Sequence, residues 1–132
     1  MKYFLCAFGD MYLGIPSALT ERVVSAARTA SAVFESDGSD VYISLPVLFG
    51  RADIPSPHGL VLKSSVNDKK VTLLAPSLDI DLEIPDEEIF SVPKVLSGVM
   101  RYCKGTGFVK RNSQTRFVLI LDSEKLTEQY CG

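Results

Sequence analysis

The 132-residue sequence has little of what most catalytic and metal sites are built from: it contains one histidine and three cysteines. His58 stands between a proline and a glycine, with no serine or cysteine at a recognised spacing, which favours a loop histidine over a catalytic one. Cys6, Cys103 and Cys131 are odd in number and far apart, so they indicate neither a disulfide framework nor a metal site. The sequence therefore predicts a protein that is not an enzyme, without catalytic residues, metal or cofactor.

The sequence also lacks a strong net charge and a long apolar run. Its formal net charge of −2 gives no general reason to bind nucleic acid. Apolar runs such as Phe117–Leu121 fall far short of the roughly 20 residues that span a membrane. The apolar start that ends at Phe8 is too short for a signal peptide, so we expect a cytoplasmic protein.

A group of cations towards the C-terminal end is a mild exception to this charge balance. The group consists of Arg101, Lys104, Lys110, Arg111 and Arg116. No aromatic stacking platform for bases is apparent beside them in the sequence, so we interpret them as the solvated side of a hairpin rather than a phosphate-binding site.

Short strand-like segments dominate what is present. In Leu78–Ile84 leucine and isoleucine alternate strictly with acidic residues, which is the period of a β-strand with one buried and one solvated face. Pro85 ends this strand because it has no N–H to donate. Carboxylates at alternate positions lie about 6–7 Å apart and project in parallel, so a solvated acidic face is favoured over a cation site.

Turn residues between apolar segments predict four hairpins. The paired segments are Tyr3–Phe8 with Met11–Ile15, Ala32–Glu35 with Asp40–Leu45, Gly59–Val66 with Val71–Pro76, and Phe108–Arg111 with Arg116–Leu121. The glycines of Lys104-Gly105-Thr106-Gly107 lack the spacing of a phosphate-binding loop and indicate a turn.

A short capped helix is predicted over Glu124–Tyr130, whereas Lys94–Cys103 fits either a helical turn or an extended segment. Eight to ten strands with regular turns predict an all-β barrel or sandwich. Ala18–Ala30 is ambiguous, because Ser17 is a good cap and alanine-rich sequence follows, which locally favours a helix.

In the order of these features the chain resembles the CheW-like domain family, the coupling modules of bacterial chemotaxis. The matching stretches cover nearly the whole chain, and each is weakly specific by itself. They are Phe8–Pro16 with Arg22-Val23-Val24, Val41–Leu45 with Phe49-Gly50, Gly59–Leu62, Ile84–Ile89 with Val92-Pro93, and Phe117–Asp122 with Leu126.

The resemblance implies a single domain over residues 1–132, built from two small five-stranded SH3-like β-barrels that are intertwined and packed side by side. It also implies that Pro16–Val24 is at least partly strand. We therefore expect strand for Ser17–Val24 and leave Ser25–Ala30 open between helix and strand. The implied function is a non-catalytic adaptor that binds the regulatory domain of a chemotaxis histidine kinase and the cytoplasmic tip of a chemoreceptor.

One turn departs from the family pattern. The family has an Asn-Leu-Arg-Gly-like turn whose arginine is tied to receptor binding, and here Ser36 or Asp37 takes its position before Gly38. Loss of that positive charge removes a charge-assisted bond to a receptor carboxylate. By position, the candidate contact residues are Glu21, Arg22, Asp37 and Gly38. An alternative function is a small β-barrel that binds a ligand or nucleic acid and has no link to kinases.

Overall fold

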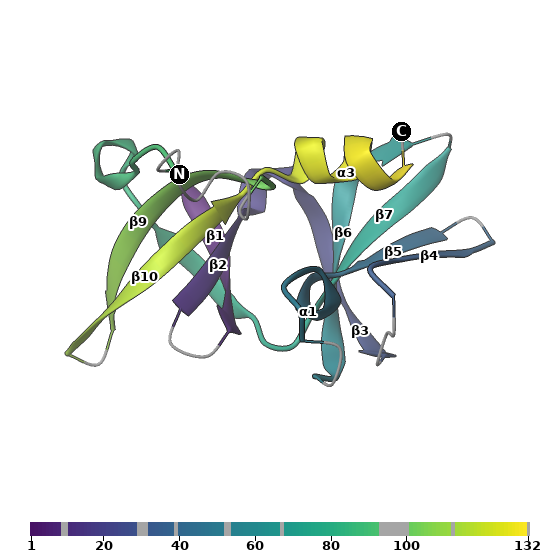
Figure 1. Cartoon of the computed structure of the whole chain (residues 1–132), viewed down its shortest axis with the longest axis horizontal. Coiled ribbons are helices and arrows are strands. Elements are labelled where there is room, and N and C mark those ends of the chain that lie inside the picture. Colours follow the sequence, from purple (N-terminus) through teal and green to yellow (C-terminus); the bar gives the residue numbers. More distant parts are fainter. Residues whose placement is uncertain are drawn as a thin grey trace. The chain divides into compact units, whose positions relative to one another are not determined.

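The computed structural model describes residues 1–8, 11–28, 32–38, 40–51, 54–66, 68–92, 101–111 and 113–131. The chain divides into two compact units (Figure 1). Unit 1 consists of Met1–Ser17 and Asp79–Leu126, and unit 2 consists of Ala18–Leu78 and Thr127–Gly132. Along the chain, the longer segment of unit 2 therefore lies between the two segments of unit 1, and its shorter segment follows them.

Unit 1 contains a five-stranded sheet in the order β8-β1-β2-β10-β9. Its strands are β1 (Lys2–Phe8), β2 (Met11–Pro16), β8 (Asp79–Glu83), β9 (Cys103–Arg111) and β10 (Gln114–Leu121). The pairing of β2 with β10 is parallel and the other pairings are antiparallel. A short 3-10 turn, η2 (Asp86–Glu88), follows β8.

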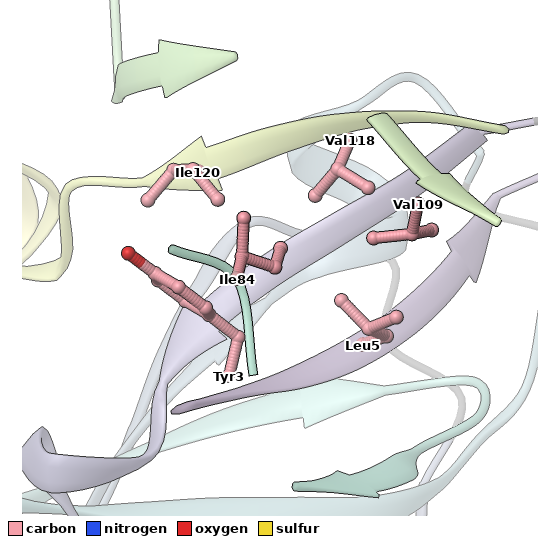
Figure 2. Packing of buried hydrophobic residues seen from close by; sticks show 6 residues of the cluster. All are labelled: Tyr3, Leu5, Ile84, Val109, Val118 and Ile120. Atoms are coloured by element: carbon pink, nitrogen blue, oxygen red, sulfur yellow. The ribbon is translucent and has the colours of Figure 1, made fainter. Parts of the chain in front are cut away.

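The core of unit 1 is a cluster of six buried side chains drawn from separate parts of the chain (Figure 2). They are Tyr3, Leu5, Ile84, Val109, Val118 and Ile120. Val118 and Ile120 face this cluster because alternate residues of a strand share a face. Leu119 and Leu121 on the other face are fully buried as well, so the last four residues of β10 are buried on both faces, as their continuous apolar run predicts.

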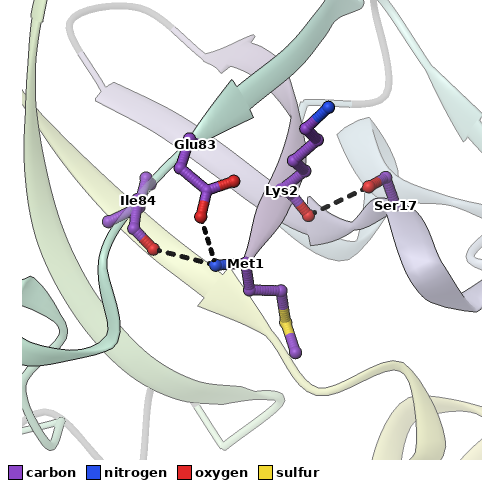
Figure 3. A network of polar contacts seen from close by, with 5 residues as sticks. All are labelled: Met1, Lys2, Ser17, Glu83 and Ile84. Carbon is purple, nitrogen blue, oxygen red and sulfur yellow. Dashed lines mark hydrogen bonds and ion pairs between the residues drawn. The ribbon is translucent and has the colours of Figure 1, made fainter.

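Polar contacts join the first residues to the end of β8 (Figure 3). The amino group of Met1 donates to Oε1 of Glu83 at 2.8 Å and to the carbonyl of Ile84 at 3.4 Å. The bond to the Glu83 carboxylate raises the pKa of this amino group. The hydroxyl of Ser17 donates to the carbonyl of Lys2 at 3.1 Å. Glu83 is exposed, in agreement with a solvated acidic side of this strand.

Unit 2 contains a second five-stranded sheet in the order β3-β6-β7-β5-β4. Its strands are β3 (Thr20–Arg28), β4 (Phe34–Asp37), β5 (Asp40–Ser44), β6 (Ser56–Val66) and β7 (Lys69–Ala75). The sheet has one parallel pairing, between β5 and β7. One row of the register aligns Val23, Leu60, Leu73, Ile43 and Phe34 across all five strands. The three central residues of this row are fully buried, so it forms part of the core of unit 2.

The local preference of Ala18–Ala30 for a helix is wrong. Ser17–Leu19 forms a single 3-10 turn, η1, and β3 continues to Arg28. Antiparallel pairing of β3 with β6 satisfies the backbone groups that a helix would satisfy internally, and so tertiary pairing overrides local propensity. The strand implied by the family resemblance begins at Thr20 rather than Ser17, and residues 29–30 lie outside the described part of the chain.

Two smaller expectations also change. The segment Lys104–Gly107 lies inside β9 and is not a turn. His58 lies in β6, opposite Ser25 and Ala75, rather than in a loop. A short helix, α1 (Leu45–Leu48), follows β5, where Ser44 Oγ accepts from the N–H of Val47 at 3.3 Å. Residues 93–100 lie outside the described part, so the expectation for Lys94–Cys103 falls mostly outside it; β9 begins at Cys103.

The all-β class and the four hairpins are confirmed by the two sheets. The terminal helix is confirmed as α3 (Ser123–Cys131). Asp122 Oδ1 accepts from the N–H of Lys125 at 3.1 Å, which satisfies one of the donors left unpaired at a helix start.

Candidate interaction surface

Glu21 and Arg22, the first two candidate contact residues, lie on β3, an edge strand of the unit 2 sheet. Both are exposed. Glu21 Oε2 lies 3.0 Å from Arg22 Nη1, and Glu21 Oε1 lies 3.2 Å from Lys70 Nζ on β7. One carboxylate thus holds two cations in place, one from its own strand and one from a central strand.

Asp37 and Gly38, the other two candidates, lie at the end of β4, which is the opposite edge strand. Asp37 pairs with Asp40 in the register, and Gly38 begins the turn between them. Gly38 has a φ of 63°, a conformation that glycine adopts without the steric cost of a Cβ atom. Next to Asp37, Ser36 Oγ accepts from Lys69 Nζ at 3.2 Å.

The sheet order therefore places the four candidates in two pairs, on the two edges of one sheet, rather than in one cluster. Sequence reasoning missed Lys69 and Lys70, the consecutive lysines of β7 that contact the β4 and β3 edges respectively. The sequence carries no signal for these contacts, because they join residues 33 and 49 positions apart.

A shallow pocket of about 140 Å³ lies on the same sheet, lined by residues of β3, β5, β6 and β7. The register aligns Arg22, Val61, Thr72 and Tyr42 in one row across these strands. Val61 and Thr72 are buried in the floor, whereas Arg22 is exposed. Asp40 and Lys70 also line the pocket. Acidic and basic groups both face it, which is the composition of a polar recognition surface.

Apolar side chains are exposed at both edges of this sheet as well. Val23 is 46% exposed on β3 and Phe34 is 37% exposed on β4. Val23 and Phe34 are the two outermost residues of the row described above, whose three central residues are buried. Edge strands with exposed apolar side chains are surfaces on which another protein can pack.

The groups with potential nucleophilic or metal chemistry lie elsewhere. Burial, with a smaller contribution from the charge of Asp122, raises the pKa of the Cys103 thiol to about 11, which keeps it protonated and a poor nucleophile near neutral pH. Within the described ranges, no three side chains of histidine, cysteine, aspartate or glutamate gather closely enough to hold a metal ion. In the same part of the chain, no helix has the length and apolar character to cross a membrane.

Comparison with known proteins finds similarity in three-dimensional structure but not in sequence. No protein-family model matches the chain, and no curated protein sequence matches it. The crystal structure of the scaffolding protein TtCheW from Thermoanaerobacter tengcongensis is similar, with a TM-score of 0.64 at 13% sequence identity. The similarity covers 91% of this chain and 87% of that chain. At this identity it establishes a shared fold.

Proposed function

We propose that this protein is a non-catalytic adaptor in bacterial chemotaxis-type signal transduction. The observation that carries the proposal is the likeness of fold to a CheW scaffolding protein over nearly the whole of both chains. The whole chain would then act as one CheW-like domain, built from both units. Its candidate partners are the regulatory domain of a chemotaxis histidine kinase and the cytoplasmic tip of a chemoreceptor, which the experiments below distinguish.

The exposed edges of unit 2 support this role. Val23 and Phe34 offer apolar contacts, and Glu21 pairs with Arg22 and Lys70, which line the pocket. Aromatic and arginine side chains of this kind dominate the energy of many protein interfaces. We therefore assign Glu21 and Arg22 to partner recognition.

The β4–β5 turn bears on the choice between kinase and receptor. Asp37 is exposed and immediately precedes Gly38, and either Ser36 or Asp37 stands where the family has an arginine. With Ser36 in that place a receptor carboxylate loses its charge-assisted bond, and with Asp37 in that place it is repelled. We expect the protein to bind the kinase regulatory domain and to bind the receptor tip weakly or not at all.

Calorimetric titration of the intact protein against each purified partner from the same cell tests this proposal. Arg22→Glu should weaken binding to the kinase domain by roughly tenfold, as expected for loss of an arginine at an interface. Lys125→Glu on α3 makes the same change of charge at another exposed position and should leave the affinity unchanged.

Asp37→Arg tests the turn separately. If the missing charge is what limits receptor binding, this variant should bind the receptor tip more tightly than the unaltered protein. Equal binding of the receptor tip by both proteins would show that the turn is not decisive. Failure of the unaltered protein to bind either partner would refute the adaptor role and leave the fold assignment intact.

A further inference from the structure

Three phenylalanine side chains gather beside strand β9 of unit 1. Phe90 and Phe108 are each 58% exposed, and Phe117 is half-buried. The ring centroids of Phe108 and Phe117 are 5.6 Å apart at a tilted angle. The sequence carries no sign of an aromatic pair near the cations of β9, and pairing of β9 with β10 is what brings these two rings together. The three residues, Phe90, Phe108 and Phe117, are called the aromatic patch below.

The register explains why these rings share one face. Phe108 lies opposite Phe117, and Phe90 forms a bridge to Thr106, two residues before Phe108. Residues two apart on a strand point to the same side. Val109, the residue after Phe108 on β9, points to the opposite side of the strand and belongs to the core cluster. The aromatic patch thus lies on the face of β9 that is turned away from the core cluster.

The backbone of β9 leaves hydrogen-bonding groups beside the aromatic patch. Phe90 and Thr106 exchange two backbone hydrogen bonds, at 2.8 and 2.7 Å. On an edge strand, the backbone N–H and C=O groups of every second residue point away from the neighbouring strand. The groups of Thr106 point away from β10 towards Phe90, so those of Phe108 and Lys110 point away from β10 as well, to the outer edge of the sheet. Within the described ranges, no residue pairs with that edge beyond the Phe90 bridge. This segment is a template for one more strand.

Charge on this edge indicates what kind of strand fits. Lys110 is exposed and shares the face of Phe108 by the alternation, and Lys104 is exposed at the other end of β9. The acidic turn η2 lies on the other face of β9. A Cβ atom on Gly107 would point to the face opposite Phe108, and the carbonyl oxygen of Glu88 lies 3.2 Å from that position. The docking face therefore combines apolar rings with positive charge.

We propose that the β9 edge from Phe108 to Lys110 docks an extended segment of a partner protein in which acidic and apolar residues alternate. The segment adds a strand to the unit 1 sheet through the backbone groups of Phe108 and Lys110. Its apolar side chain packs on Phe90 and Phe108, and its carboxylate pairs with Lys110. This edge belongs to unit 1, so it does not depend on the contacts assigned above to unit 2.

A single-stranded nucleic acid would also use aromatic rings and lysines. The backbone of β9 favours a protein segment instead. An extended peptide can pair with the outward N–H and C=O groups of Phe108 and Lys110, whereas bases stacked on the rings would leave these groups unused.

A labelled, end-blocked peptide of the required pattern tests the proposal. The segment Leu78–Ile84 of this chain, Leu-Asp-Ile-Asp-Leu-Glu-Ile, alternates in this way and serves as the probe in fluorescence anisotropy with the full chain. Phe108→Ser should weaken binding by roughly tenfold or more, as for an aromatic anchor. Lys125→Glu, at an exposed position on α3, is the control and should leave binding unchanged.

Two further measurements separate strand addition from general stickiness. Peptide binding should slow hydrogen exchange of the Phe108 and Lys110 amides, and methylation of the peptide nitrogens that face β9 should abolish binding. Lys110→Glu should weaken binding in a way that diminishes at high salt.

The proposal is overturned if the unaltered chain does not bind the peptide at millimolar concentration. It is also overturned if Phe108→Ser and Lys110→Glu, both folded, bind the peptide as well as the unaltered chain does. A thymidine oligonucleotide that binds more tightly than the peptide and is displaced by Phe108→Ser would assign the edge to nucleic acid. Self-association of the chain that Phe108→Ser abolishes would assign it to a second copy.

Discussion

Cys103 shows how burial and one neighbouring charge set the chemistry of a side chain. Transfer of a thiolate out of water is costly, and the carboxylate of Asp122 repels it further, so the pKa of the thiol rises from 9.0 to about 11. The folded state therefore holds this proton more tightly than the unfolded state does. As a consequence, the stability that Cys103 contributes is complete below pH 9 and is lost as the pH rises towards 11.

The reactivity of Cys103 follows from the same shift. At pH 8 its thiolate fraction should be about two orders of magnitude below that of an ordinary cysteine, so alkylation by iodoacetamide should be correspondingly slow. Asp122→Asn removes the repelling charge but keeps a good helix cap, so it should lower the pKa and speed alkylation. Peptide mass spectrometry over a pH series would measure the rate at this residue. An unchanged rate in Asp122→Asn would mean that burial alone sets the pKa.

Strand β9 illustrates what a glycine does inside an element rather than in a turn. A Cβ on Gly105 would stand 2.7 Å from Ile89 Cγ2 and 3.3 Å from the carbonyl oxygen of Phe90. The segment of Ile89 and Phe90 can lie against β9 only because this position has no side chain. The pair of hydrogen bonds between Phe90 and Thr106 depends on that close approach.

We expect Gly105→Ala to destabilise the protein by about 1–3 kcal/mol, since a β-branched side chain and a backbone oxygen must move. Gly38→Ala is the comparison, because nothing lies within 4 Å there and only its φ of 63° opposes a Cβ. That substitution should cost about 1 kcal/mol, and Gly38→Asn should recover most of the loss. Urea unfolding of the three variants measures these differences. A Gly105→Ala variant as stable as the parent would show that the bridge at Phe90 adapts.

Elements defined by local patterns were predictable from the sequence, whereas those defined by distant partners were not. Alternation identified β8, and turn residues identified the hairpin of β6 and β7. Thr20–Arg28 has a helical local preference and becomes strand only by pairing with β6. In the same way, Glu21 could be named as a contact residue, but its partner Lys70 could not, because only the folded sheet brings the two together.

The path of the chain distinguishes the two units. All five strands of unit 2 come from the continuous segment Ala18–Leu78, whereas the sheet of unit 1 pairs strands that precede this segment with strands that follow it. The central contact of that sheet is the parallel pairing of β2 with β10, which aligns Leu13 with Leu119. Contacts between residues so distant in the chain carry a larger loop-closure cost and form slowly.

We therefore expect the unit 2 sheet to form first when the unfolded chain is returned to folding conditions. Pulse-labelled hydrogen exchange followed by mass spectrometry should show protection in β6 and β7, around Leu60 and Leu73, before protection in β2 and β10. Once unit 2 has formed, it shortens the effective loop between the segments of unit 1, so β2 and β10 then meet at a lower entropic cost. Substitution of Leu73 by alanine, which leaves a cavity in unit 2, should delay protection of both sheets. Protection of Leu13 and Leu119 that appears first, or that is unaffected by Leu73→Ala, would contradict this order and would mean that the two units acquire their structure independently.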